Sequence, residues 1–376
     1  MEAIKLDRKE RLIFANQFRI LEKIDPEEQV GILRNRATSS DHTVRRSGPH
    51  EWRHRPWNAS MQHRPFTDSL TAELGGPRTR ALLEELDSAV PWEQLAKPVR
   101  KLYRNGDQGG RRPWPAITML KCLMLAKWFG LSDPQLEECL KDRLSFRRFV
   151  GLSLHDDTPD ETTFVVFRRR LRQEQVHDDL FDMAVKHLEK KGLLLREGTL
   201  VDATILEAPR GMKRKDGTST RDEDASFTKK RNRTYHGYKG HIAVDRSGIV
   251  TDYRYSTAKD HDSKYIDDLT MHERVAVIAD SAYMDQKREE ELKRRGVLYG
   301  IVRRRKRGQE KLPEIDERIN RMIASVRAVV EHPFAWIRRM GFNGARYRGR
   351  ERNAMDFAFV LMAYNFKRSL SLMSAG

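Results

Sequence analysis

Three acidic residues occupy positions where their carboxylates could hold metal ions. Asp202 is the single acid of a β-rich run that begins at Leu200. Asp280 ends a second apolar run, and Glu331 lies on a helical pattern nearer the C-terminus. An acid in an apolar strand is costly unless it is hydrogen-bonded, paired or bound to a cation. Each acid alone is more often a cap or a solvated residue, but the three together form the carboxylate set that a pair of divalent cations requires.

Two arginines flank the glutamate on the predicted helix. Arg327 precedes Glu331 by four residues and Arg338 follows Arg327 by eleven. At roughly 100° per residue, these offsets place the three side chains within about 40° of one another. The alternative is an ordinary solvated helix face with i,i+4 charge pairing, which is common and weak. Pro333 is unusual there, because a proline inside a helix costs about 3 kcal/mol unless something compensates.

The chemistry that such acids support is phosphoryl transfer. Mg²⁺, or Mn²⁺ in its place, prefers a few carboxylate oxygens together with water and substrate phosphate. Two such ions about 4 Å apart stabilise the attacking and the leaving oxygens of an in-line displacement. We therefore expect the three carboxylates to converge on one site that holds two ions.

The elements that must position these acids form an α/β pattern. A strand with Asp202 is followed by two strands joined by a turn, then by strand, helix and strand, and finally by the long helix with Glu331. This order predicts a mixed α/β sheet domain. The strands are expected at 200–206, 235–245, 249–258, 274–280 and 297–302, and the intervening helix at 285–295.

Upstream of the sheet, the chain has a different character. Residues 6–24 form an amphipathic helical pattern, and the basic, Pro-rich and Ser-rich stretch after it is typical of a flexible linker. Residues from 66 to about 195 are expected to be helical. The predicted domains are residues 1–60 (helix and linker), 61–195 (an all-helical domain) and 196–372 (the mixed-sheet domain).

The charge of the chain indicates a polyanionic partner. Lys and Arg outnumber Asp and Glu by 72 to 55, giving a formal charge of +17, which favours nucleic acid first and an anionic membrane second. Basic clusters at 167–172 and at Arg303, Arg304 and Arg305 are candidate phosphate contacts, although a solvated basic face is the commoner case. No apolar run is long enough for a membrane span or a secretory signal, so we expect a cytoplasmic protein, nucleoid-associated when it binds DNA.

Several motifs resemble the DDE transposases of bacterial insertion sequences, in the insertion sequence five group. The resemblance covers about residues 60 to 370 and is carried by the motifs YHGYKGHIAVD (235–245), ADSAY (279–283), VEHPF (330–334) and GARYRG (344–349). The first 25 residues are separately similar to the opening of the YfbU family, over too short a stretch to imply a chemistry.

The resemblance implies an RNase H-like catalytic domain after a helical domain that binds element ends and dimerises. It makes Asp202, Asp280 and Glu331 the catalytic, metal-binding triad. It places Arg327 and Arg338 at the basic positions that flank the glutamate. The tyrosine of the family's signature would fall at Ala324, which puts its contact to the DNA end in doubt.

Four residues of one motif are further candidates for lining the DNA path: Tyr235, His236, Tyr238 and Lys239. The alternative is that they form a packed aromatic edge of the sheet. The leading functional prediction is a transposase, acting as a homodimer on double-stranded DNA, that cleaves its terminal inverted repeats and joins them to target DNA. The alternatives are a transposase-derived DNA-binding protein or repressor without cleavage, and a structure-selective nuclease.

Overall fold

The computed structural model describes residues 77–103, 113–212, 219–230, 232–305 and 308–374. All of them belong to one compact unit, Leu74–Gly376. The predicted N-terminal helix and linker, residues 1–60, lie outside the described residues. Among the described residues, no helix is both long and apolar enough to cross a bilayer.

The described residues before the sheet form helices, as predicted. Ser132 caps α7 in a capping box with Gln135, and Asp160 caps α9 by accepting a hydrogen bond from the Thr163 amide at 2.6 Å. The helices are α4 (Pro77–Ala89), α5 (Trp92–Arg100), α6 (Ala116–Trp128), α7 (Asp133–Asp142), α8 (Leu144–Val150), α9 (Glu161–Gln173) and α10 (Val176–Lys190).

A mixed sheet follows, in the strand order β2-β3-β1-β5-β6, with β4 also paired to β3. β1, β5 and β6 are parallel to one another, whereas β3 is antiparallel to each of its neighbours. This arrangement is consistent with the RNase H-like fold that the resemblance implies. The strands are β1 (Thr199–Glu207), β2 (Ser226–Lys230), β3 (Arg233–Val244), β4 (Val250–Thr257), β5 (Ala276–Ala279) and β6 (Leu298–Ile301).

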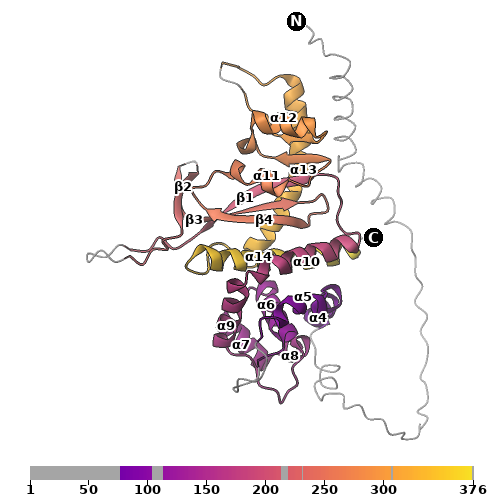
Figure 1. Cartoon of the computed structure of the whole chain (residues 1–376), viewed down its shortest axis with the longest axis vertical. Coiled ribbons are helices and arrows are strands. Elements are labelled where there is room, and N and C mark those ends of the chain that lie inside the picture. The colour runs from indigo at the N-terminus through magenta and orange to yellow at the C-terminus, as the bar shows by residue number, and fades with distance from the viewer. Residues whose placement is uncertain (1–76, 104–112, 213–218, 231, 306–307, 375–376) are drawn as a thin grey trace, which may run out of the picture. The chain divides into compact units, whose positions relative to one another are not determined.

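Short helices cover one face of the sheet. Val201, Ala279 and other apolar strand residues form a core there with Ile266 of α11 (Ile266–Leu269) and Leu292 of α12 (Gln286–Arg294). Two one-turn 3-10 helices, η2 (Asp262–Lys264) and η3 (Ser281–Tyr283), lie in the connections on this side. The opposite face contacts α13 (Glu314–Arg339) and α14 (Arg350–Met373) (Figure 1).

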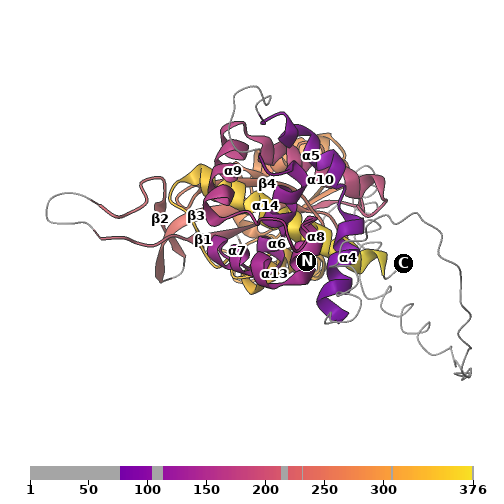
Figure 2. The ribbon, with the colours of Figure 1, turned by 90° about the horizontal axis from the view of Figure 1, so that it is seen from below.

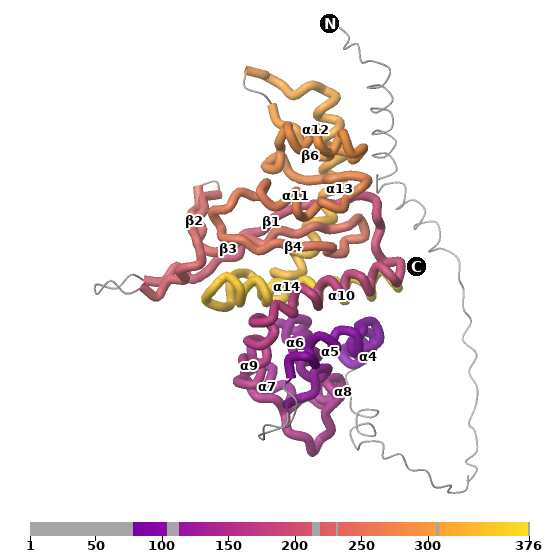
Figure 3. Tube along the Cα trace, in the orientation of Figure 1, coloured from indigo at the N-terminus to yellow at the C-terminus, as the bar shows by residue number. Residues whose placement is uncertain are grey.

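The helix α14 is a central element for which the sequence analysis predicted nothing. It lies between the sheet and the N-terminal helices, in contact with α6, α10 and β4 (Figures 1 and 3), and Figure 2 shows it from below beside α6 and α10. Lys127 of α6 forms a buried ion pair with Asp356 of α14, and the Trp128 indole donates to the Ala363 carbonyl at 2.9 Å. α14 therefore joins the helical region to the sheet.

The predicted long helix is present as α13 and continues through Pro333 without a break. Its buried face consists of Ile323, Val326, Val330, Pro333, Phe334 and Ile337, and it packs against β1 and β5. The 3.6-residue apolar period thus sets which face meets the sheet. Arg327 and Glu331 lie on the flank of that face.

Candidate active site

The pairing register of the sheet brings Asp202 and Asp280 together. Val201 of β1 is the Cα partner of Ala279 on the parallel strand β5, so each aspartate directly follows a member of that pair. Neighbouring strands lie about 4.8 Å apart. Asp202 still belongs to β1, whereas Asp280 comes directly after β5 and caps the one-turn helix η3. Two distant positions of the sequence thereby become neighbours where the parallel pairing of β1 and β5 ends.

The environments of the two aspartates shift their pKa values in opposite directions. Burial raises the pKa of Asp202, against a hydrogen bond from the Ala203 amide at 2.8 Å and the attraction of Arg327. Burial also acts to raise the pKa of Asp280, but hydrogen bonds from Ser281 and the cations Arg327 and Arg304 lower it overall. The two carboxyls therefore differ in how readily they carry charge.

Arg327 of α13 is the cation that acts on both carboxyls. Its charge favours the ionised form of Asp202 and of Asp280. Its Nε atom is buried and has no hydrogen-bond partner among the described residues. One guanidinium thus offsets two carboxylates without satisfying its own donors completely, which is the expected property of a site prepared for another charged group.

Glu331 is exposed, one helical turn beyond Arg327 on α13. Within the described parts of the chain, no group of three Asp, Glu, His or Cys side chains is placed to hold a metal ion. The structure thus brings Asp202 and Asp280 together, but not all three carboxylates as we expected. The physical reason is that sheet register positions the first two, whereas Glu331 lies on the solvent-facing flank of its helix. Arg338 and Ala324 are exposed on the same helix.

For two of the β3 candidates, the structure supports the packed-edge alternative. His236 and Tyr238 are 1 % and 0 % exposed, and the Tyr238 hydroxyl donates to Asp222 at 2.7 Å. Lys239 is directed into the protein, with its Nζ 2.8 Å from an Asp262 oxygen. Tyr235 is half-buried beneath the Arg233 guanidinium, which lies 4.9 Å from its ring centroid.

The basic block after β6 is partly engaged with protein acids. Arg303 lies 3.6 Å from Glu289 and 3.5 Å from Asp316, and Arg305 donates to the Glu310 carbonyl at 3.0 Å. Arg304 is exposed and close enough to lower the pKa of Asp280. Arg304 is therefore the member of this block whose position best suits a phosphate near the acids.

Some arginines of α9 are buried or ion-paired within the protein, and others are exposed. Arg168 is buried and forms a two-pronged ion pair with Asp133, and Arg172 lies 3.2 Å from Glu351. Arg169 and Arg170 are exposed. The basic run at 167–172 is therefore in part a structural feature.

The sequence analysis missed two residues close to the acids. Lys230, at the end of β2, acts to lower the pKa of Asp202. Tyr283 of η3 is 2 % exposed and shares an electrostatic environment with Asp202, Asp280 and Arg327. The ADSAY motif contains this tyrosine, so its closeness in sequence to Asp280 was the available signal.

The residues present fit a divalent cation in part. Asp202 and Asp280 are neighbouring, half-buried carboxylates that share one cationic side chain, and carboxylate oxygen is the donor that Mg²⁺ and Mn²⁺ prefer. Glu331 would be the carboxylate that α13 contributes. The donor set therefore suits hard, oxygen-liganded metal ions.

Comparison with known families supplies the remaining evidence. Residues 194–366 match the family described as a transposase DDE domain, and residues 75–170 match a transposase domain known as DUF772. The first match spans the sheet with its three acids, and the second spans most of the N-terminal helices. No solved structure matches the chain significantly. These two transposase domains, in this order, support a DDE transposase of the insertion-sequence type, an enzyme of DNA cleavage and transfer.

Proposed function

We propose that the protein cleaves the ends of its own insertion sequence and joins them to target DNA by phosphoryl transfer that depends on two divalent metal ions, Mg²⁺ or Mn²⁺. The observation that carries this proposal is the neighbouring pair Asp202 and Asp280, linked by strand register and sharing Arg327. A carboxylate pair beside the last paired residues of two parallel strands, in a chain of charge +17, suits a phosphodiester substrate.

Each side chain has a separate role in this proposal. Asp202, Asp280 and Glu331 would hold the metals, which when bound would supply Lewis-acid stabilisation of the attacking and leaving oxygens. Arg327, Arg338 and Arg304 bind phosphates of the DNA, since guanidinium groups match phosphate geometry. Tyr235, whose ring lies beneath the Arg233 guanidinium, is a further residue that would line the DNA path. The active species is a homodimer on double-stranded DNA that carries the terminal inverted repeats.

The test is cleavage of a DNA fragment that carries the inverted repeats flanking the gene. With Mg²⁺, the wild type should nick the element end to free a 3′-hydroxyl, and Asp202→Asn, Asp280→Asn and Glu331→Gln should each lose that activity while still binding the DNA. Glu290→Gln, at an exposed acid on α12, is the matched control. Cleavage by Asp280→Asn at the wild-type rate would show that the metal-site assignment is wrong.

A second candidate is a transposase-derived repressor that binds element ends without cutting them. One observation favours it, because the described residues hold no group of three metal-binding side chains. Ala324 in place of the signature tyrosine points the same way. Metal-independent binding of the inverted repeats, with no strand cleavage by the wild type in Mg²⁺ or Mn²⁺, would support this candidate.

A further inference from the structure

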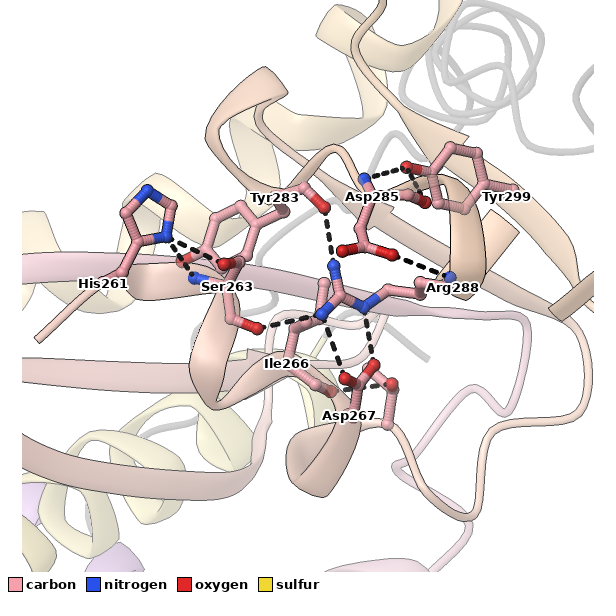
Figure 4. A network of polar contacts seen from close by, with 9 residues as sticks. His261, Ser263, Ile266, Asp267, Tyr283, Asp285, Arg288 and Tyr299 are labelled. Atoms are coloured by element: carbon pink, nitrogen blue, oxygen red, sulfur yellow. Dashed lines mark hydrogen bonds and ion pairs between the residues drawn. The ribbon is translucent and has the colours of Figure 1, made fainter. Parts of the chain in front are cut away.

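A buried arginine on α12 holds together three segments beside the candidate site. Arg288 is 9 % exposed. Its guanidinium contacts η2 and α11 in the connection between β4 and β5, and η3 in the connection between β5 and α12 (Figure 4). These segments lie on the face of the sheet opposite α14, next to the ends of β4 and β5.

The guanidinium uses its donors in several directions. Nε donates to Asp267 Oδ1 at 2.5 Å and Nη2 to Asp267 Oδ2 at 3.0 Å, which makes a two-pronged ion pair with α11. Nη2 also donates to the Ser263 carbonyl at 2.9 Å, and Nη1 donates to the Tyr283 carbonyl at 2.8 Å. Figure 4 shows these contacts converging on one side chain. A planar fork with five donors can make this set, whereas an ammonium group cannot.

The contact with Tyr283 leads directly to Asp280. η3 is a single turn, in which the Tyr283 amide donates to the Asp280 carbonyl at 3.0 Å. The Asp280 carboxylate accepts hydrogen bonds from the Ser281 amide and, at 2.8 Å, from the Ser281 hydroxyl. Arg288 therefore holds the last residue of the turn whose first hydrogen bonds orient this carboxylate.

The segment between η3 and α12 is also fixed by hydrogen bonds. Asp285 caps α12 by accepting from the Arg288 amide at 3.0 Å, and the Tyr299 hydroxyl accepts from the Asp285 amide at 3.0 Å. These bonds fix the helix that carries Arg288 relative to β6. The guanidinium then transmits that fixed position to Tyr283.

We propose that Arg288 is a positioning residue for the reaction site: by holding η3, η2 and α11 in one arrangement, it keeps the Asp280 carboxylate in the orientation in which it binds a divalent cation. This inference rests on the proposed function of Asp280. Arg288 itself touches neither metal nor DNA. Partners that orient a metal ligand typically contribute about 10- to 100-fold to metal affinity.

The test compares Mn²⁺ binding to the full-length wild type and variants by titration calorimetry, without DNA. Arg288→Lys keeps the charge and loses the fork, and should weaken Mn²⁺ binding about 10- to 100-fold. Arg295→Gln is the matched control, because Arg295, directly after α12, donates to the Met271 and Glu273 carbonyls and holds nothing next to Asp280. It should bind Mn²⁺ as the wild type does. In cleavage assays, Arg288→Lys should need more Mg²⁺ and recover when Mg²⁺ is raised, with unchanged metal-free DNA affinity.

A milder variant and a reference variant make the outcomes separable. Asp267→Asn weakens the ion pair of Arg288 with α11 at an exposed acid, so it provides the test if Arg288→Lys does not fold. It should bind Mn²⁺ several-fold more weakly than the wild type does. Wild-type Mn²⁺ affinity in the folded clamp variants, with binding lost in Asp280→Asn, would overturn the role of Arg288. Wild-type affinity in Asp280→Asn would instead overturn the proposed metal site.

Discussion

Two clusters of buried charge in this protein are compensated in different ways. Lys127 and Asp356 form a one-to-one ion pair with both side chains 6 % exposed, at the contact of α6 with α14. Where the parallel pairing of β1 and β5 ends, Asp202 and Asp280 share Arg327, whose Nε lacks a hydrogen-bond partner among the described residues. The closed pair serves the assembly of the fold, whereas the incompletely compensated cluster has the properties of a site for additional charge.

The largest expected effect is on catalysis, and it should come from the incompletely compensated cluster. Asp280→Asn should lower the rate of end cleavage by about 1000-fold or more, because loss of a metal ligand removes several kcal/mol of transition-state stabilisation. Single-turnover cleavage with saturating Mg²⁺ measures this loss. An equal loss of cleavage rate in the matched Glu290→Gln variant would show that the effect is not specific to the Asp202 and Asp280 cluster.

The ion pair of Lys127 and Asp356 should instead contribute to the free energy of unfolding. Lys127→Ala leaves a buried carboxylate unpaired and should lower the free energy of unfolding by about 3–5 kcal/mol. Chemical denaturation measures this change. The double variant Lys127→Met with Asp356→Leu should recover most of the loss, and Mn²⁺ binding should remain that of the wild type wherever the protein is folded. Weakened Mn²⁺ binding in that double variant would mean that the two clusters are coupled.

The buried side chain of His241 tests how much stability is lost when a buried group without a directly contacting counter-ion becomes charged. Burial lowers the pKa of His241 from 6.5 to about 4, and its side chain is fully buried. The unfolded chain takes up the proton first, so this contribution to stability is complete above pH 6.5 and is lost as the pH falls towards 4. The expected loss is about 3 kcal/mol. His241→Gln should flatten this part of the pH profile, measured by denaturation at a series of pH values, and an unchanged slope would contradict the assignment.

The smallest expected effect is on thermal stability, and it should differ between the buried and the exposed acid of the site. Burial disfavours the charged form of Asp202, so Asp202→Asn should raise Tm by on the order of 2 °C, since active-site charges often cost stability. Glu331→Gln, at an exposed position, should leave Tm unchanged. Scanning calorimetry without divalent ions measures both. A lower Tm for Asp202→Asn would show that Arg327 already compensates this carboxylate fully.

Much of the fold could be predicted from local patterns. Apolar runs predicted the strands around Asp202 and Asp280, and the helical patterns after residue 66 predicted the N-terminal helices, because these signals are local. β2 and α14 were not predicted. β2 lies in a polar, basic stretch without alternation, and it becomes a strand because β3 offers it a partner.

The side chains of β3 show why the site itself was harder to predict. Tyr238 and Lys239 are adjacent in sequence but point to opposite faces of the sheet, so one pairs with Asp222 and the other with Asp262. Which face is covered depends on helices that pack from distant parts of the chain. The residue types indicated a DNA surface, and the packing of the sheet assigned two of them to the interior.

The sequence by itself determined the identities of the three acids, the order of the strands and helices that carry them, and the amphipathic face of α13, because local residue patterns specify each of these. Only the tertiary structure decided that Asp202 and Asp280 become neighbours through strand register, that Glu331 lies on an exposed flank, and that Arg288, one arginine among many, clamps the turn after Asp280. These relations depend on contacts between residues far apart in the chain, which local patterns do not specify.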